Sequence, residues 1–179
     1  MLPKQLSKIG NKTTCPGAII LRDGKILWGM SKDRQYLVCQ LPSKRLLRYF
    51  RPSVVQGKNR KGEPKPEIRY WAPAGEGAIH TDCNGFLGEY RTWGGELVEN
   101  FVQAVARDIM VVGMERVDKT SRFPIVLHNY DELNCEVDEK DDLEAALEVL
   151  IEMMTKDLPP WTKGCPVKAE GWVGRRYRK

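Results

Sequence analysis

The adjacent carboxylates Asp131 and Glu132 are the residues of this chain whose type and spacing could do chemistry. They lie in segment 123–137 (FPIVLHNYDELNCEV), between a short apolar run at 124–127 and an alternating run at 133–137. Two strand-like runs joined by a short polar link predict a β-hairpin. A hairpin tip would hold both carboxylates on a rigid support, as a Mg²⁺-dependent phosphoryl-transfer site requires. Two solvated turn acids are the ordinary alternative, and the hairpin alone favours it.

An amphipathic helix is predicted over residues 96–114, immediately before the hairpin. Apolar residues recur there at spacings of four and three, and neighbouring apolar residues widen the face, so we expect a largely buried helix. The polar stripe that remains must meet water or a polar ligand. Amides and a guanidinium suit the edges and phosphates of a nucleic acid, although water is the more common partner. The recurring apolar residues are Val98, Val102, Val105, Ile109 and Val112, and the stripe is Glu96, Asn100, Gln103 and Arg107.

A second helix is predicted over residues 141–154, with acidic residues in its first turn, where the helix dipole favours anions. The acidic run at 138–144 is therefore better explained by helix capping than by metal binding. Residues 167–173 (VKAEGWV) alternate and predict a last strand. The basic tail that follows could contact nucleic-acid backbone or be solvated.

The first part of the chain predicts antiparallel strands. Residues 18–28 form two apolar runs about a DG turn, which favours a hairpin, and residues 36–41 and 46–50 predict a further strand pair. Residues 52–66 are basic and rich in Gly and Pro, which predicts a flexible surface loop. The whole pattern predicts an α+β fold, a small antiparallel sheet with packed helices.

The net charge of +5 is distributed unevenly. Residues 1–70 hold 16 Lys and Arg against 4 Asp and Glu, residues 71–162 hold 7 against 19, and residues 163–179 hold 6 against 1. The net charges are thus +12, −12 and +5, so that two basic regions flank an acidic middle that contains the candidate carboxylates. This distribution fits a nucleic-acid enzyme that recruits a divalent metal. Solvated charged faces would give the same distribution.

Composition excludes several classes of protein. No apolar run is long enough to span a bilayer, and the N-terminus lacks the apolar region of a secretory signal, so we expect a cytosolic protein. The five cysteines form no CxxC pair and the chain has only two histidines. These features speak against a disulfide framework and against a zinc site.

Four local patterns resemble the DNA polymerase I-like (family A) polymerases, and in particular their phage branch. The predicted hairpin tip, residues 130–132 (YDE), is similar to the third polymerase motif, usually HDE. Residues 94–110 (GGELVENFVQAVARDIM) are similar to the phage-type segment that precedes this motif. Residues 41–45 (LPSKR) resemble the family's LPSGR turn, with lysine in place of the glycine. Residues 169–179 (AEGWVGRRYRK) resemble a phage polymerase C-terminus.

The resemblance covers about residues 36–179 and implies a partial palm subdomain of a right-hand polymerase. It implies that residues 17–92 form a basic region connecting distal fingers to palm, and that residues 93–179 form the C-terminal half of the palm. Residues 1–16 would be a lead-in.

The resemblance also implies roles for individual residues. Asp131 would be one of the two aspartates that hold the catalytic Mg²⁺ pair, and Glu132 would support that site. The residues implied to contact DNA are Tyr130, Gln103, Asn100, Arg107 and Arg45.

The second metal-binding aspartate, near a DYSQIE-like strand, and the nucleotide-gripping fingers helix are absent from this sequence. We therefore expect an enzyme portion with negligible activity when isolated. The implied partners are primer-template DNA, a dNTP, and either the N-terminal remainder of the polymerase or a split-gene partner chain. An exposed half-palm would also self-associate. The implied location is the cytoplasm of a bacterial host cell.

Two other functions remain open from the sequence. The chain could be a non-catalytic nucleic-acid-binding remnant of a prophage polymerase gene, which a neighbouring reading frame with the missing motifs would contradict. It could also be an unrelated metal-dependent nuclease, although every other acidic cluster is explained by helix capping.

Overall fold

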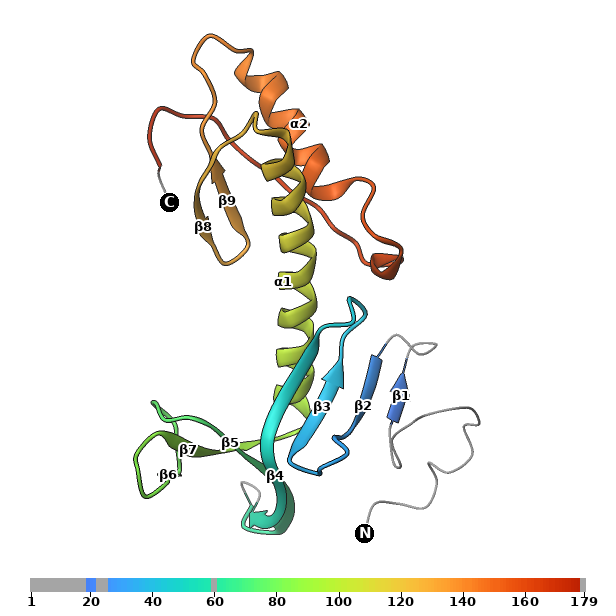
Figure 1. Cartoon of the computed structure of the whole chain (residues 1–179), viewed down its shortest axis with the longest axis vertical. Helices are drawn as coiled ribbons and strands as arrows, with labels where there is room; N and C mark the ends of the chain where they lie inside the picture. The colour runs from blue at the N-terminus through green and yellow to red at the C-terminus, as the bar shows by residue number, and fades with distance from the viewer. Residues whose placement is uncertain (1–18, 22–25, 59–60, 178–179) are drawn as a thin grey trace. The chain divides into compact units, whose positions relative to one another are not determined.

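The computed structural model describes residues 19–21, 26–58 and 61–177 (Figure 1). The chain divides into two compact units, Met1–Gln103 and Ala104–Lys179, which are described separately below. The expected lead-in and the expected DG turn lie outside the described residues. No helix among the residues that are described combines the length and the apolar character needed to cross a membrane.

Seven strands form one antiparallel sheet in the first unit (Figure 1). The spatial order is β1-β2-β3-β4-β5-β7-β6, so most strands pair with the strand that precedes them in the chain. The strand pairs predicted within residues 18–28 and 36–50 are confirmed. The strands are β1 (Ile19–Leu21), β2 (Ile26–Met30), β3 (Tyr36–Gln40), β4 (Leu46–Lys58), β5 (Pro64–Pro73), β6 (His80–Thr81) and β7 (Leu87–Thr92).

The long β4–β5 hairpin occupies the residues predicted to be a flexible loop, 52–66, so that prediction is wrong. Its register shifts once, at a bulge that contains Arg51 and Pro52. Proline has no N–H to donate to a central ladder, and a bulge is where a sheet tolerates it. The glycines and prolines thus mark a bulge and the hairpin ends, while the backbone between them stays paired.

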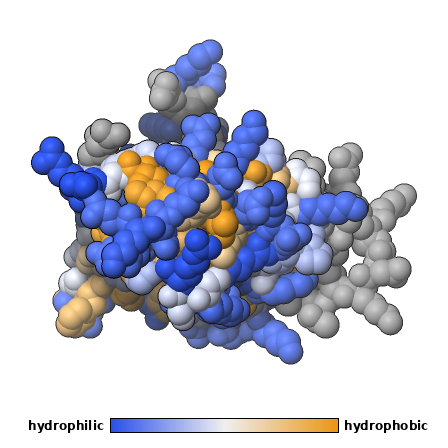
Figure 2. Space-filling model, turned by 90° about the horizontal axis from the view of Figure 1, so that it is seen from above, coloured by the Kyte–Doolittle hydropathy of each residue, from blue (hydrophilic) through white to orange (hydrophobic). Residues whose placement is uncertain are grey.

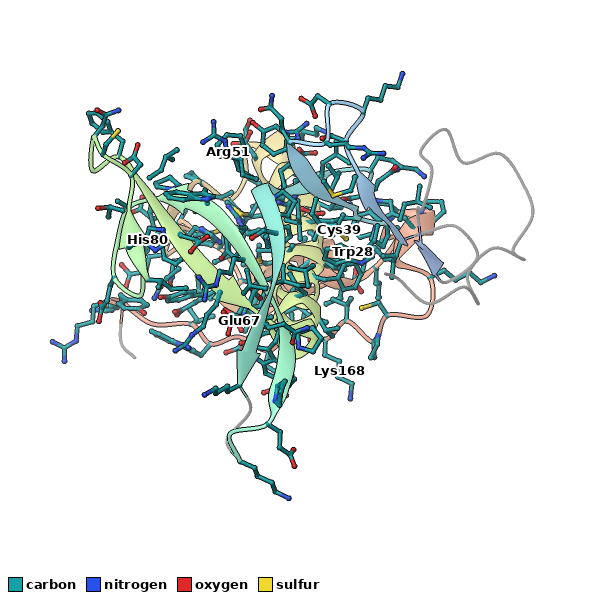
Figure 3. The ribbon with its side chains drawn as sticks, turned by 90° about the horizontal axis from the view of Figure 1, so that it is seen from below. Trp28, Cys39, Arg51, Glu67, His80 and Lys168 are labelled. Atoms are coloured by element: carbon teal, nitrogen blue, oxygen red, sulfur yellow. The ribbon has the colours of Figure 1, made fainter. Side chains whose placement is uncertain are left out.

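The core of the first unit lies on one face of this sheet. Cys39 and Tyr49 are buried there, and the Tyr49 ring meets the Tyr70 ring edge-on, with centroids 5.1 Å apart. Trp28 lies directly opposite Cys39 in the β2–β3 register, and the two are labelled side by side in Figure 3. Leu97, in the first turn of the following helix, is also buried. The start of that helix therefore shares the core of the first unit.

Helix α1 (Gly94–Thr120) confirms the predicted helix and extends it at both ends. The prediction of a largely buried helix holds only in part, because Val98 is 60% exposed and Val102 is 56% exposed. The buried apolar residues of the helix are Leu97 in the first unit and Ile109, Met110 and Val117 in the second. Helical spacing identifies residues that share a face, but it does not say which of two adjoining apolar faces meets the core.

The second unit contains the predicted hairpin and the predicted second helix, and both are confirmed. Strands β8 (Ile125–Asn129) and β9 (Glu132–Cys135) pair antiparallel. Helix α2 (Leu143–Thr155) begins after Asp142, whose Oδ1 accepts a hydrogen bond of 3.1 Å from the Ala145 backbone N–H. This is an N-cap, so the capping explanation of these acidic residues is confirmed at Asp142.

The core of the second unit is formed by Val117, Phe123 and Ala146, and residues of the hairpin and α2 pack around it. A Cβ atom at Gly113 would lie 2.5 Å from the Met154 sulfur, so α1 and α2 approach closely here and a larger residue would require the Met154 side chain to shift.

Arg116, on α1, forms hydrogen bonds with the backbone at the end of α2. Its guanidinium donates to the carbonyl of Met153 at 3.3 Å and also to the carbonyls of Lys156 and Asp157. The carbonyls of Met153 and Lys156 belong to the end of α2, where carbonyls lack an intrahelical partner, and Asp157 follows directly.

The chain after α2 forms a short 3₁₀ helix, η2 (Pro160–Thr162), and then runs without regular structure. The strand predicted over residues 167–173 is therefore wrong. Exposure still alternates from Val167 to Glu170, but the segment pairs with no strand among the described residues. Alternation predicts an extended chain, whereas a strand also needs a partner ladder.

Candidate functional site

The β8–β9 hairpin carries the candidate carboxylates at its tip, which we call the acidic tip (Tyr130, Asp131 and Glu132). Asn129 lies opposite Glu132, so only Tyr130 and Asp131 form the connection. Tyr130 is 88% exposed and has a φ of +51°, a left-handed conformation that is uncommon for tyrosine. Asp131 is exposed. A tight two-residue turn thus holds one carboxylate in solvent on a short, paired support.

Glu132 is half-buried, and its environment differs from that of Asp131. The Tyr177 hydroxyl donates a hydrogen bond of 3.1 Å to Glu132 Oε2. This bond to the carboxylate raises the pKa of the Tyr177 hydroxyl. The C-terminal segment therefore folds back onto the acidic tip, and Glu132 is held while Asp131 is not.

Arg175 gives a second contact between the C-terminal segment and the acidic region of the second unit. Its Nη2 lies 2.6 Å from Glu139 Oε1. The sequence offered two explanations for this basic tail, nucleic-acid contact or solvation, and neither included these partners. A tyrosine among arginines was the only signal, and it did not identify Glu132 as the acceptor.

Arg107 and His128 lie next to the acidic tip within the second unit. Arg107 Nη1 is 3.3 Å from His128 Nε2. His128 Nε2 is also 3.0 Å from the Tyr130 carbonyl oxygen. A ring nitrogen either accepts or donates, so His128 Nε2 makes one of these two bonds in a given tautomer. The His128 proton thereby decides whether the ring is bound to the helix or to the hairpin turn.

The remaining members of the predicted polar stripe belong to the first unit. Asn100 is half-buried and its Nδ2 donates to the Tyr49 hydroxyl at 3.4 Å. Gln103 is exposed and donates to Glu99 at 3.2 Å. Glu96 is half-buried. The stripe is thus a mixture, with Asn100 engaged in the core and Gln103 available at the surface.

Arg45 lies in the β3–β4 turn of the first unit, where it is exposed. The turn is closed by a hydrogen bond of 2.9 Å from the Lys44 N–H to the Leu41 carbonyl. Lys44 has a φ of +73°. This is the position at which the resembling LPSGR turn has glycine, the residue that adopts this conformation most readily.

The acidic tip does not form a complete metal site by itself. Among the described residues, no three or more His, Cys, Asp or Glu side chains are placed to hold a metal ion. Asp131 makes no hydrogen bond or ion pair with a described residue, and its carboxylate oxygens are the type of ligand that Mg²⁺ takes. The acidic tip can therefore supply one carboxylate, that of Asp131, without a partner among the described residues, and one, that of Glu132, that already accepts a hydrogen bond from Tyr177.

Comparison with known proteins relates this chain to a phage enzyme. It is 34% identical over 144 residues to the DNA polymerase of Bacillus phage SP02, an alignment that covers 80% of this chain. The alignment covers only 20% of that polymerase, so this chain spans about a fifth of the length of the relative it matches. No family model matches the chain. No solved structure matches it either.

Proposed function

We propose that this chain is the C-terminal portion of a DNA-directed DNA polymerase, and that it contributes part of the palm. The observation that carries the proposal is the exposed Asp131 carboxylate at a two-residue hairpin tip, in a chain related to a phage DNA polymerase. A projecting carboxylate on a paired strand end is suited to a metal site for nucleotidyl transfer.

Asp131 would hold Mg²⁺ through one carboxylate, and Glu132 would support the site. When bound, Mg²⁺ supplies Lewis-acid activation of the primer hydroxyl and neutralises charge on the phosphates in a two-metal mechanism. The described residues lack a full ligand set, so the other aspartate must come from another polypeptide segment. The Tyr177 hydroxyl would keep Glu132 oriented toward that site.

The proposed substrates are a dNTP and primer-template DNA. Exposed Gln103 and Arg107 carry donors that can reach phosphates or base edges, as does Arg45. Tyr130 offers an exposed ring beside Asp131, where a primer end would lie. Asn100 would act indirectly, because its side-chain amide is bonded to Tyr49.

The proposed protein partner is the remainder of a polymerase, on the same chain or as a split-gene subunit. Hydrophobic residues reach the surface in separate groups between hydrophilic ones (Figure 2). Val126 and Leu127, on strand β8, are 56% and 44% exposed. Such side chains are expected to pack against the missing part or to cause self-association. Sedimentation of the chain alone as a compact monomer at high concentration would contradict this.

The test is primer extension by the chain co-expressed with the neighbouring reading frame. We expect the complex to extend a primer with Mg²⁺ and dNTPs, and Asp131→Asn to reduce the rate by at least about a thousandfold, because a metal ligand is lost. Asp141→Asn makes the same chemical change at an exposed residue before α2 and should leave the rate unchanged.

The possible outcomes distinguish a catalytic Asp131, a complete metal site and a non-catalytic chain. Equal rates for Asp131→Asn and the parent would refute the catalytic assignment. Robust extension by the isolated chain would refute the incomplete metal site. DNA binding without extension in any complex would instead identify a non-catalytic remnant.

A further inference from the structure

The sheet of the first unit has a second face, which differs from the buried one. Residues that alternate with the buried Cys39 and Tyr49 point away from the core. Every residue from β2 to β7 that the strand registers place on this second face is half-buried or exposed. We call it the open face, and its main members are Tyr36, Arg48, Phe50, Trp71, His80 and Arg91.

Aromatic rings form a row across the open face. Tyr36 lies opposite Phe50, with ring centroids 5.2 Å apart, and Phe50 lies opposite Trp71 on the next strand. Trp71 meets the His80 ring edge-on at 5.4 Å. The Arg51 guanidinium lies over the Phe50 ring, 5.0 Å from its centroid. The row therefore runs from β3 over β4 and β5 to β6, and it passes β7, where Glu89 lies opposite both Trp71 and His80. The Arg51 cation lies within the row, at Phe50.

Cationic side chains flank this row. Arg48 and Arg91 are exposed and make no ion pair with a described residue. Arg69 is different, because Glu67 and Glu89 bind its guanidinium at 3.0 and 3.2 Å, and Glu89 also lies 3.5 Å from His80 Nδ1. Arg69 and the two carboxylates together carry −1, and Arg48, Arg51 and Arg91 bring the sum for these residues to +2. The charge that remains available to a partner is positive.

We propose that the open face binds single-stranded DNA. Half-buried rings in a row can stack successive bases, while Arg48, Arg51 and Arg91 contact the phosphates. The net charge of +12 over residues 1–70 complements a polyanion. A duplex hides the faces of its bases in the stack, so a row of aromatic rings favours an unpaired strand. The choice of DNA rests on the proposed function, since a template strand is unpaired ahead of the primer end.

The test is fluorescence anisotropy with a labelled oligothymidylate of about 20 nucleotides, long enough for the site sizes of such surfaces. Trp71→Leu keeps an apolar side chain but removes the ring, and should weaken binding about tenfold. The double variant Arg48→Ala with Arg91→Ala should weaken it further and should reduce the slope of log affinity against log salt by about 1.4.

The control variants remove an aromatic ring, or two positive charges, at other places. Phe86→Leu alters an aromatic residue that is 76% exposed in the β6–β7 turn. Lys119→Ala with Lys140→Ala removes two exposed charges from the second unit. Both should retain the parent affinity, and circular dichroism should show that every variant is folded.

Three results would overturn the inference. The first is an unchanged affinity in folded Trp71→Leu and in the double arginine variant. The second is equal affinity of the parent for a duplex of the same length. The third is that the open-face variants keep their affinity for DNA but no longer bind the co-expressed polypeptide. Asp131→Asn should not alter oligothymidylate binding. If primer extension fails while oligothymidylate binding is intact, the result counts against the proposed function and does not contradict DNA binding by the open face.

Discussion

Replacing Lys44 by glycine should stabilise the first unit. Lys44 is exposed and has a φ of +73°, in the β3–β4 turn. A side chain in the left-handed conformation costs about 1–2 kcal/mol relative to glycine. Glycine in turn loses about 0.5–1 kcal/mol because its unfolded chain is more flexible. The net expectation for Lys44→Gly is a gain of roughly 0.5–1 kcal/mol in the free energy of unfolding.

Lys32→Gly provides the matched control. Lys32 is exposed in the β2–β3 turn, and its φ is not positive. Only the entropic cost applies there, so this variant should lose about 0.5–1 kcal/mol. The same substitution is therefore expected to have opposite signs at two exposed turn lysines of one sheet.

Urea unfolding followed by tryptophan fluorescence measures the difference. The two variants should differ by about 1–2 kcal/mol, which at a slope of about 1–3 kcal/mol per molar urea separates the midpoints by roughly 0.3–2 M, with Lys44→Gly the higher. Trp28 and Trp71 lie in the sheet and report on this unit. Equal shifts of the same sign in both variants would show that the left-handed turn carries no strain.

Three further predictions concern the thiols and the second unit. Burial raises the pKa of the Cys39 thiol from 9.0 to about 11, so its neutral form stabilises the fold fully below pH 9 and this contribution is lost as the pH rises toward 11. At pH 8 a thiol reagent should label the exposed Cys83 and Cys165 at once and Cys39 only after denaturation; early labelling of Cys39 would contradict its burial. Phe123→Ala should cost about 3–5 kcal/mol by chemical denaturation, because the ring is 1% exposed, and a cost under about 1 kcal/mol would refute its place in the core. Asp142→Ala should cost about 1 kcal/mol by loss of the N-cap, whereas Asp142→Asn should retain most of it.

Local patterns predicted the elements that depend on local physics. The hairpin around Asp131 and the helix after Asp142 followed from alternation, helical spacing and capping, and both are present. These signals lie within a few residues of the element that they specify. Such signals can therefore be interpreted without knowledge of the rest of the fold.

Predictions failed where pairing across the sequence decides the structure. Residues 52–66 contain the composition of a loop, but β5 pairs with β4 along most of that stretch. Residues 167–173 alternate as a strand does, yet no described strand pairs with them. Val98 has the spacing of a core residue and is exposed. In each case a distant partner, present or absent, outweighs local propensity.

The candidate site shows the same division. The position of Asp131 at a turn could be predicted from its neighbours. The bond from Tyr177 to Glu132 joins residues 45 positions apart, and the contact of Arg107 with His128 joins residues 21 positions apart. No periodicity encodes such pairs, so only the folded chain could identify which carboxylate is held and which is free.

The strand order of the first unit has a consequence for the way in which the chain folds. From β1 to β5 each strand pairs with the one before it, so the pairing partners are close in sequence. Closing short loops costs little entropy, and topologies with local pairing fold quickly. We hypothesise that this sheet forms hairpin by hairpin during synthesis, before residues 104–179 are complete. Pulse-labelled hydrogen exchange should then protect the β2–β5 amides before those of α2, and the reverse order would refute the hypothesis.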